Sequence, residues 1–251
     1  MGLIKIDKQD EIALVKLSHG VTNAINLDLI LELAKDLDEL NNDSNINGVV
    51  LTGMNEKFFA IGFDLPELFD YDIGKMRLFY QTFNRLSLDI YTFPKPVIAA
   101  LNGHAIAGGC ILAICCDYRF IAEGKKLMGL NEIKLGIPVP YPADCILRQL
   151  VGARNAQEIC YTGEFYGPEG LLRMGLVDQV ISAEELIKKA IEKAKSLGEM
   201  PKDAFQMVKH NRVERVTAQV LDKLDEREAF FLEKWFARDV RKLLKEAINK
   251  F

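Results

Sequence analysis

The chain has 251 residues, of which 49% are hydrophobic and 27% charged, a composition typical of a globular protein that buries a substantial core. Its formal net charge of -4, from 36 acidic and 32 basic residues that are interspersed, gives no overall attraction to nucleic acid or to acidic membranes. Five cysteines without a CxxC pair, and only three histidines, argue against a disulfide framework or a zinc site. No apolar run approaches the roughly 20 residues that span a bilayer, and the first residues lack a signal-peptide pattern. We therefore expect a cytoplasmic protein that binds no metal, nucleic acid or membrane.

The first part of the chain alternates between strand and helix patterns. Residues 3–17 alternate apolar and charged side chains, which predicts two strands around a polar turn at 7–11. Apolar residues at helical spacing predict an amphipathic helix over 27–40, with Asn26 as its N-cap. The apolar run at 48–54 predicts a strand that is buried on both faces.

The same alternation continues toward the C-terminus. The predicted elements are a helix over 74–93, a strand over 97–101, a helix from about Gly108, a strand over 118–122, a short strand ending near Leu130, helices over 143–150 and 153–161, and a strand over 176–181. Such an order predicts an α/β fold. Beyond Ala183 the chain is rich in lysine, glutamate and leucine with a helical period, which predicts a helical tail.

An aromatic-rich stretch lies in this tail, over residues 220–236. It predicts either a helix that covers the protein's own core or a contact between copies of the chain.

Two glycine-containing loops follow apolar strands. The first is KFFAIGFDL at 57–65, and the second is NGHAIAGGC at 102–110, which leads into an apolar helix. A double glycine at the start of a helix lets a ligand approach the backbone and leaves the N–H groups of the first turn free. Neither loop matches G-x-G-x-x-G or the P-loop, so the usual nucleotide-binding motifs are not indicated.

A family resemblance rests on the run PKPVIAALNGHAIAGGCILAICCDYRFIAE, which lies between KFFAIGFDLPEL and GLNEIKLGIP. In order and spacing these motifs resemble the crotonase (enoyl-CoA hydratase/isomerase) superfamily over nearly the whole chain. The resemblance implies an α/β fold of the crotonase type, a spiral of ββα units, with a crotonase core over 1–197 and a C-terminal helical trimerisation region over 198–251. It also implies a homotrimer or hexamer and an acyl-CoA substrate.

Carried over to this sequence, the resemblance places the family's oxyanion hole on the backbone N–H groups of Phe63 and Gly108. Removing a proton alpha to a thioester puts negative charge on the carbonyl oxygen, which fixed donors in a dry site stabilise. The resemblance also implies that coenzyme A is bound mainly by main-chain groups of the following residues: Ile61, Phe63, Asp64, Leu65 and Gly108.

The family's two acid/base carboxylates are not both present. One falls on Glu132, but the other position, three residues after Gly108, is Ile111. Hydration requires groups that activate water and protonate carbon, whereas moving a double bond from the 3,4 to the 2,3 position requires one base. The sequence therefore predicts an isomerase that converts 3-enoyl-CoA to trans-2-enoyl-CoA, and the GLNE string resembles the delta-3,delta-2-enoyl-CoA isomerases. The acidic residue expected of a dienoyl-CoA isomerase is replaced by Pro140.

Two alternatives remain open. The chain could be an enoyl-CoA hydratase, or catalyse another crotonase reaction, with Asp144 acting through water in place of the missing glutamate. It could also be a non-catalytic acyl-CoA-binding subunit. We expect Asp144 first as a helix cap, with Tyr141 near the acyl chain, and His104 as a structural histidine. The isomerase reaction requires no bound cofactor, because coenzyme A belongs to the substrate.

Overall fold

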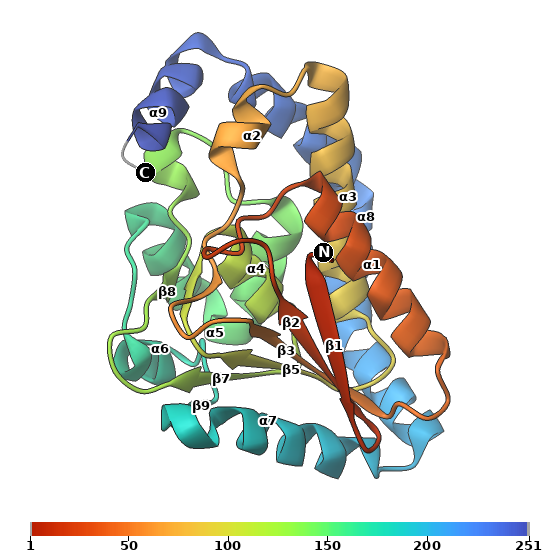
Figure 1. Ribbon diagram of the computed structural model, residues 1–251. Coiled ribbons are helices and arrows are strands. Elements are labelled where there is room, and N and C mark those ends of the chain that lie inside the picture. The colour runs from red at the N-terminus through yellow and green to blue at the C-terminus, as the bar shows by residue number, and fades with distance from the viewer. Residues whose placement is uncertain (1, 250–251) are drawn as a thin grey trace.

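The computed structural model describes residues 2–249 and arranges their strands in two β-sheets (Figure 1). In the larger sheet the order is β1-β2-β3-β5-β7-β9, with β1 and β2 antiparallel and every later pair parallel. Its strands are β1 (Ile4–Gln9), β2 (Ile12–Leu17), β3 (Gly48–Gly53), β5 (Val97–Leu101), β7 (Tyr118–Ala122) and β9 (Gln179–Ile181). The smaller sheet is parallel and consists of β4 (Phe58–Ala60), β6 (His104–Ile106) and β8 (Met128–Gly129). The α/β prediction is confirmed.

Helices cover both faces of the larger sheet (Figure 1). In the described part of the chain they are α1 (Leu27–Asn42), α2 (Leu65–Phe69), α3 (Ile73–Tyr91), α4 (Gly108–Ile114), α5 (Tyr141–Thr162), α6 (Pro168–Met174), α7 (Ala183–Gly198), α8 (Lys202–Trp235) and α9 (Arg238–Ile248), with a 3₁₀ helix η1 (Glu132–Leu135). α7 lies along one face, where its Leu186, Ala190 and Ala194 recur every four residues and are buried with side chains of the strands. The other face supports the main core and the loops described below.

Several elements agree closely with their sequence patterns. α1 begins after Asn26, whose side-chain oxygen accepts a hydrogen bond from the Leu29 N–H at 3.0 Å, as expected of an N-cap. All six residues of β3 are buried, as predicted for a strand covered on both faces.

Other boundaries differ from the predictions for local reasons. The turn in the first hairpin is shorter than 7–11, because β1 continues to Gln9. The predicted helix over 74–93 runs from Ile73 to Tyr91. The two helices expected over 143–161 are joined as α5, with a non-helical Gly152 (φ 75°) at the place where the prediction separated them. The predicted strand over 176–181 is limited to β9, since the turn that ends α6, with Gly175 at a φ of 77° and the Leu176 N–H donating to the Leu171 carbonyl, precedes it.

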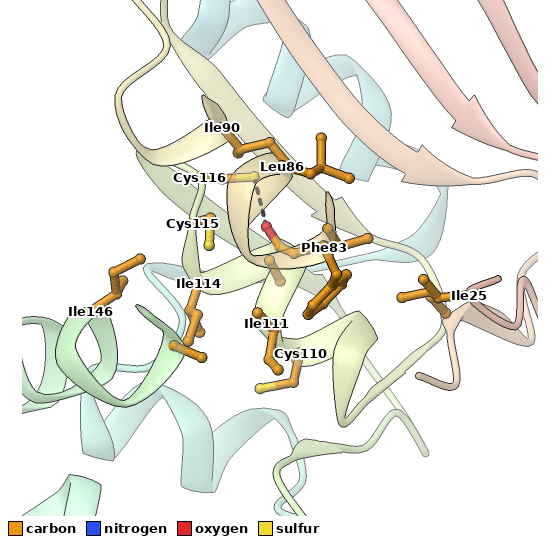
Figure 2. Close-up of a cluster of buried hydrophobic side chains, with 14 of the residues drawn as sticks. Ile25, Phe83, Leu86, Ile90, Cys110, Ile111, Ile114, Cys115, Cys116 and Ile146 are labelled. Carbon is orange, nitrogen blue, oxygen red and sulfur yellow. Dashed lines mark hydrogen bonds between the residues drawn. The ribbon is translucent and has the colours of Figure 1, made fainter. Parts of the chain in front are cut away.

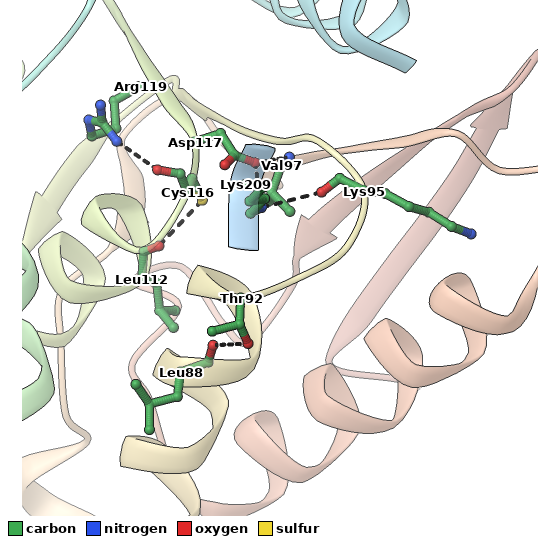
Figure 3. Close-up of polar contacts among 9 residues, drawn as sticks. All are labelled: Leu88, Thr92, Lys95, Val97, Leu112, Cys116, Asp117, Arg119 and Lys209. Atoms are coloured by element: carbon green, nitrogen blue, oxygen red, sulfur yellow. Dashed lines mark hydrogen bonds and ion pairs between the residues drawn. The ribbon is translucent and has the colours of Figure 1, made fainter. Parts of the chain in front are cut away.

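The C-terminal helices fold back over the rest of the same chain. α8 packs against α3 and α5, and α9 packs against α2 and η1. Figure 3 shows Lys209 of α8 beside Asp117, whose carboxylate it contacts at 2.7 Å. In the aromatic-rich stretch, Phe231 and Trp235 are fully buried, so this segment covers the protein's own core. Among residues 2–249, the structure contains no helix that combines the length and apolarity needed to cross a membrane.

Candidate active site

The two glycine-containing loops lie against each other at the ends of the smaller sheet. β4 pairs with β6, so the residues that follow these strands emerge side by side. A Cβ atom placed on Gly62 would lie 2.8 Å from the Ala107 Cβ and 3.0 Å from the Gly108 nitrogen. Gly62 also has a φ of 95°, which a residue with a side chain rarely adopts. Glycine at position 62 is therefore required both by the backbone conformation and by the closeness of the second loop.

Phe63 and Gly108, the two residues predicted to form an oxyanion hole, are brought together by this packing. A Cβ atom on Gly108 would lie 3.3 Å from the Phe63 ring. Within residues 2–249, neither backbone N–H donates to a turn, a loop or a side chain. Ala107 precedes Gly108 with a φ of 48°, a strained conformation for alanine of the kind that concentrates at functional sites. The arrangement leaves two backbone donors in adjacent loops available to a ligand.

Glu132 reaches the same region through the third strand of the smaller sheet. β8 pairs with β6, and the Ala107 N–H donates to the Gly129 carbonyl at 2.9 Å. η1 begins at Glu132, only three residues after Gly129. The strand pairing therefore fixes the start of η1 beside the loop that carries Gly108.

The Glu132 side chain is a buried carboxyl group without a charged partner. Its residue is 5% exposed, and Oε2 has no hydrogen-bond partner among the described residues. Burial raises the pKa of Glu132 to about 7, because the charged form loses its hydration in an apolar environment. A carboxyl group with this pKa exchanges protons readily near neutral pH, as a general base requires.

The other residues expected to bind coenzyme A follow the first loop. The Ile61 N–H donates to the Thr22 carbonyl at 3.2 Å, and the Asp64 N–H donates to the Ile25 carbonyl at 2.9 Å. The Asp64 side chain caps α2, and Leu65 is the first residue of that helix. These bonds hold the loop rigidly next to Phe63.

Comparison with known proteins identifies the family. The sequence profile described as enoyl-CoA hydratase/isomerase matches residues 7–251. The chain belongs to this family. It is 31% identical to enoyl-CoA delta isomerase 1, mitochondrial, of Mus musculus over 88% of the chain and 76% of that protein. It is 34% identical to a short-chain-enoyl-CoA hydratase of Clostridium acetobutylicum over 76% of the chain and 74% of that protein. The crystal structure of human mitochondrial delta3-delta2-enoyl-CoA isomerase superposes with a TM-score of 0.95 at 26% identity, over 99% of the chain and 97% of that structure.

In this chain an apolar residue, Ile111, lies at the position where the resemblance places the second carboxylate. Ile111 is fully buried in α4, in a cluster of apolar side chains that includes Cys110 and Phe83 (Figure 2). Burial, with the nearby Glu132 carboxyl as a smaller cause, raises the pKa of the Cys110 thiol well above its usual range. The thiol therefore stays protonated near neutral pH and supplies no second base.

The alternative candidates have structural partners. The Asp144 carboxylate pairs with Arg148 one turn further along α5, and it does not accept a capping hydrogen bond, contrary to expectation. The Nδ1 atom of His104 accepts a hydrogen bond from the Leu127 N–H at 3.0 Å, which agrees with a structural role. In residues 2–249, no cluster of three or more His, Cys, Asp or Glu side chains is placed to hold a metal ion.

A cationic groove of about 650 Å³, which sequence reasoning missed, lies between α9 and the end of α2. It is lined by Phe69, Arg238, Asp239, Arg241, Lys242 and Lys245. Arg241 donates from Nη2 to the Phe69 carbonyl at 2.8 Å, and its guanidinium lies 3.4 Å from the centre of the Phe69 ring. The sequence contains a pattern that predicts this groove, because its basic residues are spaced three and four apart and therefore share one side of a helix.

Proposed function

We propose that the protein is an enoyl-CoA isomerase, which converts 3-enoyl-CoA to trans-2-enoyl-CoA through a thioester enolate. The observation that carries this proposal is the environment of Glu132, a buried and unpaired carboxyl group with a pKa of about 7. It stands beside the loop of Gly108, while Ile111 occupies the position of the second carboxylate. One base and an oxyanion hole are sufficient for a double-bond shift.

In the proposed mechanism the thioester carbonyl oxygen accepts hydrogen bonds from the backbone N–H groups of Phe63 and Gly108. The ionised Glu132 carboxylate removes a proton from C2, and the electron pair of the C–H bond delocalises into a dienolate whose charge rests largely on the carbonyl oxygen. Glu132 then returns the proton to C4, which leaves the double bond between C2 and C3. Atoms and charge balance without a metal or bound cofactor, and burial of Glu132 excludes water that could quench the enolate.

Hydration is the second candidate, because a short-chain-enoyl-CoA hydratase is among the relatives. It would require a group that activates water, and Asp144, the acidic residue suggested for that role, is paired with Arg148. The buried Ile111 cannot orient water. The site therefore favours isomerisation. A non-catalytic acyl-CoA-binding role is less well supported, since a strained oxyanion loop and a raised carboxyl pKa serve turnover rather than binding.

Recognition of the coenzyme A part is proposed to combine the main chain at Ile61, Phe63, Asp64, Leu65 and Gly108 with the cationic groove. The groove adjoins α2, which begins directly after Asp64, so phosphate groups bound there would remain within reach of the loop. Arginine and lysine side chains are suited to phosphates.

Assembly and location complete the proposal. We expect a homotrimer or hexamer, which is supported by exposed apolar side chains on α8, among them Met207, Val208 and Leu221. A reducing compartment such as the cytoplasm is supported by free cysteines, four of which are buried.

The deciding experiment incubates the purified protein with 3-hexenoyl-CoA and, separately, with 2-hexenoyl-CoA in deuterated water. We expect 2-enoyl-CoA from the first substrate, a rate at least about 1,000-fold lower for Glu132→Gln, and no 3-hydroxyacyl-CoA from either. Mass and absorbance identify the products. Rapid formation of 3-hydroxyacyl-CoA would establish the hydratase instead, and binding of acyl-CoA without any turnover would support the non-catalytic role.

A further inference from the structure

The backbone donor at Phe63 is oriented by the segment that precedes α1, residues 22–26. The Ile25 N–H donates to the Gly62 carbonyl at 2.7 Å, and the Ile25 carbonyl accepts the Asp64 N–H at 2.9 Å. The Gly62 carbonyl and the Phe63 N–H belong to one planar trans peptide group, so they point in opposite directions. The hydrogen bond from Ile25 therefore fixes the direction of the Phe63 N–H.

The two proposed oxyanion donors differ in what holds them. Gly108 begins α4, and the Ala107 carbonyl of its peptide group accepts the Ile111 N–H at 2.9 Å, so the helix itself fixes this donor. Phe63 instead lies in a loop and follows Gly62, whose φ of 95° belongs to the residue type with the widest backbone freedom. The orientation of the Phe63 donor therefore depends on contacts from outside its own loop.

Asn23 anchors the segment that carries Ile25. It is fully buried, and its Nδ2 atom donates to the Phe59 carbonyl at 2.9 Å and to the Phe58 carbonyl at 3.3 Å, both in β4. Its Oδ1 atom accepts the His19 N–H at 2.9 Å. Asn23 has a φ of 50°, in the left-handed region where asparagine is enriched. Both ends of the amide thus hold the segment on the strand that leads into the oxyanion loop.

Asn26 holds the other end of the same segment. Its Nδ2 atom donates to the Glu67 carboxylate at 2.7 Å, and the Tyr71 hydroxyl donates to the other oxygen of that carboxylate. The Glu67 N–H in turn donates to the Asp64 side chain at 3.2 Å. The residue directly after Phe63 is therefore connected to Asn26 through α2.

We propose that Asn23 and Asn26 are positioning residues of the reaction, which act through Ile25 and α2 to hold the Phe63 N–H in the direction that the thioester oxygen requires. The inference rests on the proposed function, because it assumes that this N–H binds the carbonyl oxygen of an acyl-CoA. A misplacement of about 1 Å in a catalytic group can cost about 100-fold in rate. Loss of either amide should therefore weaken the polarisation of the thioester more than the binding of the ligand.

The test measures the thioester polarisation directly, by difference infrared spectroscopy of hexanoyl-CoA labelled with carbon-13 at its carbonyl and bound to the full-length protein. In the wild type we expect the C=O stretch to move to lower frequency on binding, because two N–H donors weaken the bond. Asn23→Gly removes the amide and tolerates the positive φ. Its shift should be smaller by about half, because one of the two donors no longer points at the oxygen. A full shift in folded Asn23→Gly would overturn the proposal.

Asn26→Asp provides the same test if the first variant does not fold. It retains the oxygen that caps α1 but replaces the donor to Glu67 by an oxygen that repels the carboxylate, so the shift should again be reduced. The matched control is Asn155→Gly on α5, whose amide also donates to two carbonyls, those of Val151 and Met174, each at 3.2 Å. This control loses stability as well but should retain the full infrared shift. An equal reduction in the control would overturn the proposal.

Kinetics with 3-hexenoyl-CoA separate orientation of the donor from binding. Asn23→Gly should lower kcat by about 100-fold and leave KM within about threefold of the wild type. A raised KM with an unchanged kcat would overturn the proposal, because it would place Asn23 in ground-state binding. The expected infrared shifts without any isomerisation would contradict the proposed function and leave this inference standing. No shift in the wild type would overturn both.

Discussion

The Glu132 carboxyl group, the proposed base, opposes folding at the pH at which it is ionised. Its folded-state pKa of about 7 lies above the ordinary value of 4.5. The stability linked to its neutral form is therefore complete below about pH 4.5 and is lost as the pH rises to about 7.

This linkage gives a prediction for the free energy of unfolding. Between about pH 5 and about pH 8, the wild type should lose about 2 to 3 kcal/mol relative to Glu132→Gln, which has no ionisation at this position. Urea denaturation of both proteins across this range measures the difference. A constant difference at all pH values would mean that the carboxyl group has an ordinary pKa.

The closeness of the two loops at Gly62 gives a second prediction at the residue scale. Gly62→Ala adds a methyl group 2.8 Å from the Ala107 Cβ and 3.0 Å from the Gly108 nitrogen, so it should displace the oxyanion donors and lower kcat by about 100-fold. Gly124→Ala is the control, because its φ of 89° imposes a comparable strain with nothing within 4 Å of the new atom. Gly124→Ala should lose about 1 kcal/mol of stability because of its positive φ, and Gly62→Ala should lose more because its new methyl group also displaces the second loop. Steady-state kinetics that show the same loss in both would remove the oxyanion role from this loop.

At the residue scale, the sequence predicted site residues only where they lie in local motifs. Glu132, Phe63 and Gly108 lie in strings whose order and spacing are informative. An apolar environment that raises the pKa of Glu132 could be expected of a base, but the full burial of its side chain could not be predicted from the local string, because burial depends on residues that are distant in sequence.

At the scale of elements, the attachment of α8 depends on a buried ion pair. Lys209, with a side chain 6% exposed, contacts the Asp117 carboxylate, which also accepts the Val97 N–H at 2.8 Å. Figure 3 shows the Lys209 ammonium between Asp117 and the Lys95 carbonyl. The pair therefore links α8 to the beginning of β5 and to the end of α4.

Replacing Lys209 should weaken the attachment of α8 and lower the free energy of unfolding. Lys209→Met leaves the Asp117 carboxylate partly buried without its cation, and we expect a loss of about 2 to 3 kcal/mol in the free energy of unfolding. Lys189→Met, which breaks the exposed pair with Glu192, should leave the free energy of unfolding nearly unchanged. Denaturant titrations check both values. Equal small effects would show that apolar packing alone holds α8.

The long elements were predictable, whereas two of the short strands, β4 and β6, were not. α1, β3 and β5 contain enough residues for their periodicity to be evident. β4 and β6 have three residues each, too few to show alternation, and appeared as parts of loops. These strands nevertheless bring the two proposed oxyanion loops together. The motifs therefore predicted the residues of the site, but hydrophobic periodicity could not predict how they are brought together.

For the whole molecule, the distribution of charge matters more than its total. The chain carries a net charge of -4, yet Arg238, Arg241, Lys242 and Lys245 gather at one end, beside α2. A local potential of this kind attracts an anionic ligand within about 10 Å at 0.1 M salt.

We therefore expect the KM for acyl-CoA to rise several-fold between about 0.05 M and about 0.3 M NaCl. The double variant Lys242→Gln, Lys245→Gln should show a higher KM at low salt and a weaker dependence on salt. Lys188→Gln, Lys189→Gln on α7 removes the same charge from the opposite side of the larger sheet and should behave as the wild type. An identical salt dependence in all three proteins would mean that the groove does not meet the substrate.

The stacking of Phe231 on Tyr80 has a consequence for the order in which the site is synthesised and folded. α8 packs on α3 through this stacking, and η1, which begins at Glu132, packs against α9, the last helix within residues 2–249. Translation delivers these helices after every catalytic residue has already been made. A chain synthesised only as far as Glu132 thus carries Phe63, Gly108 and Glu132 but lacks their cover, and the site is complete only after α8 and α9 have been made and have folded back.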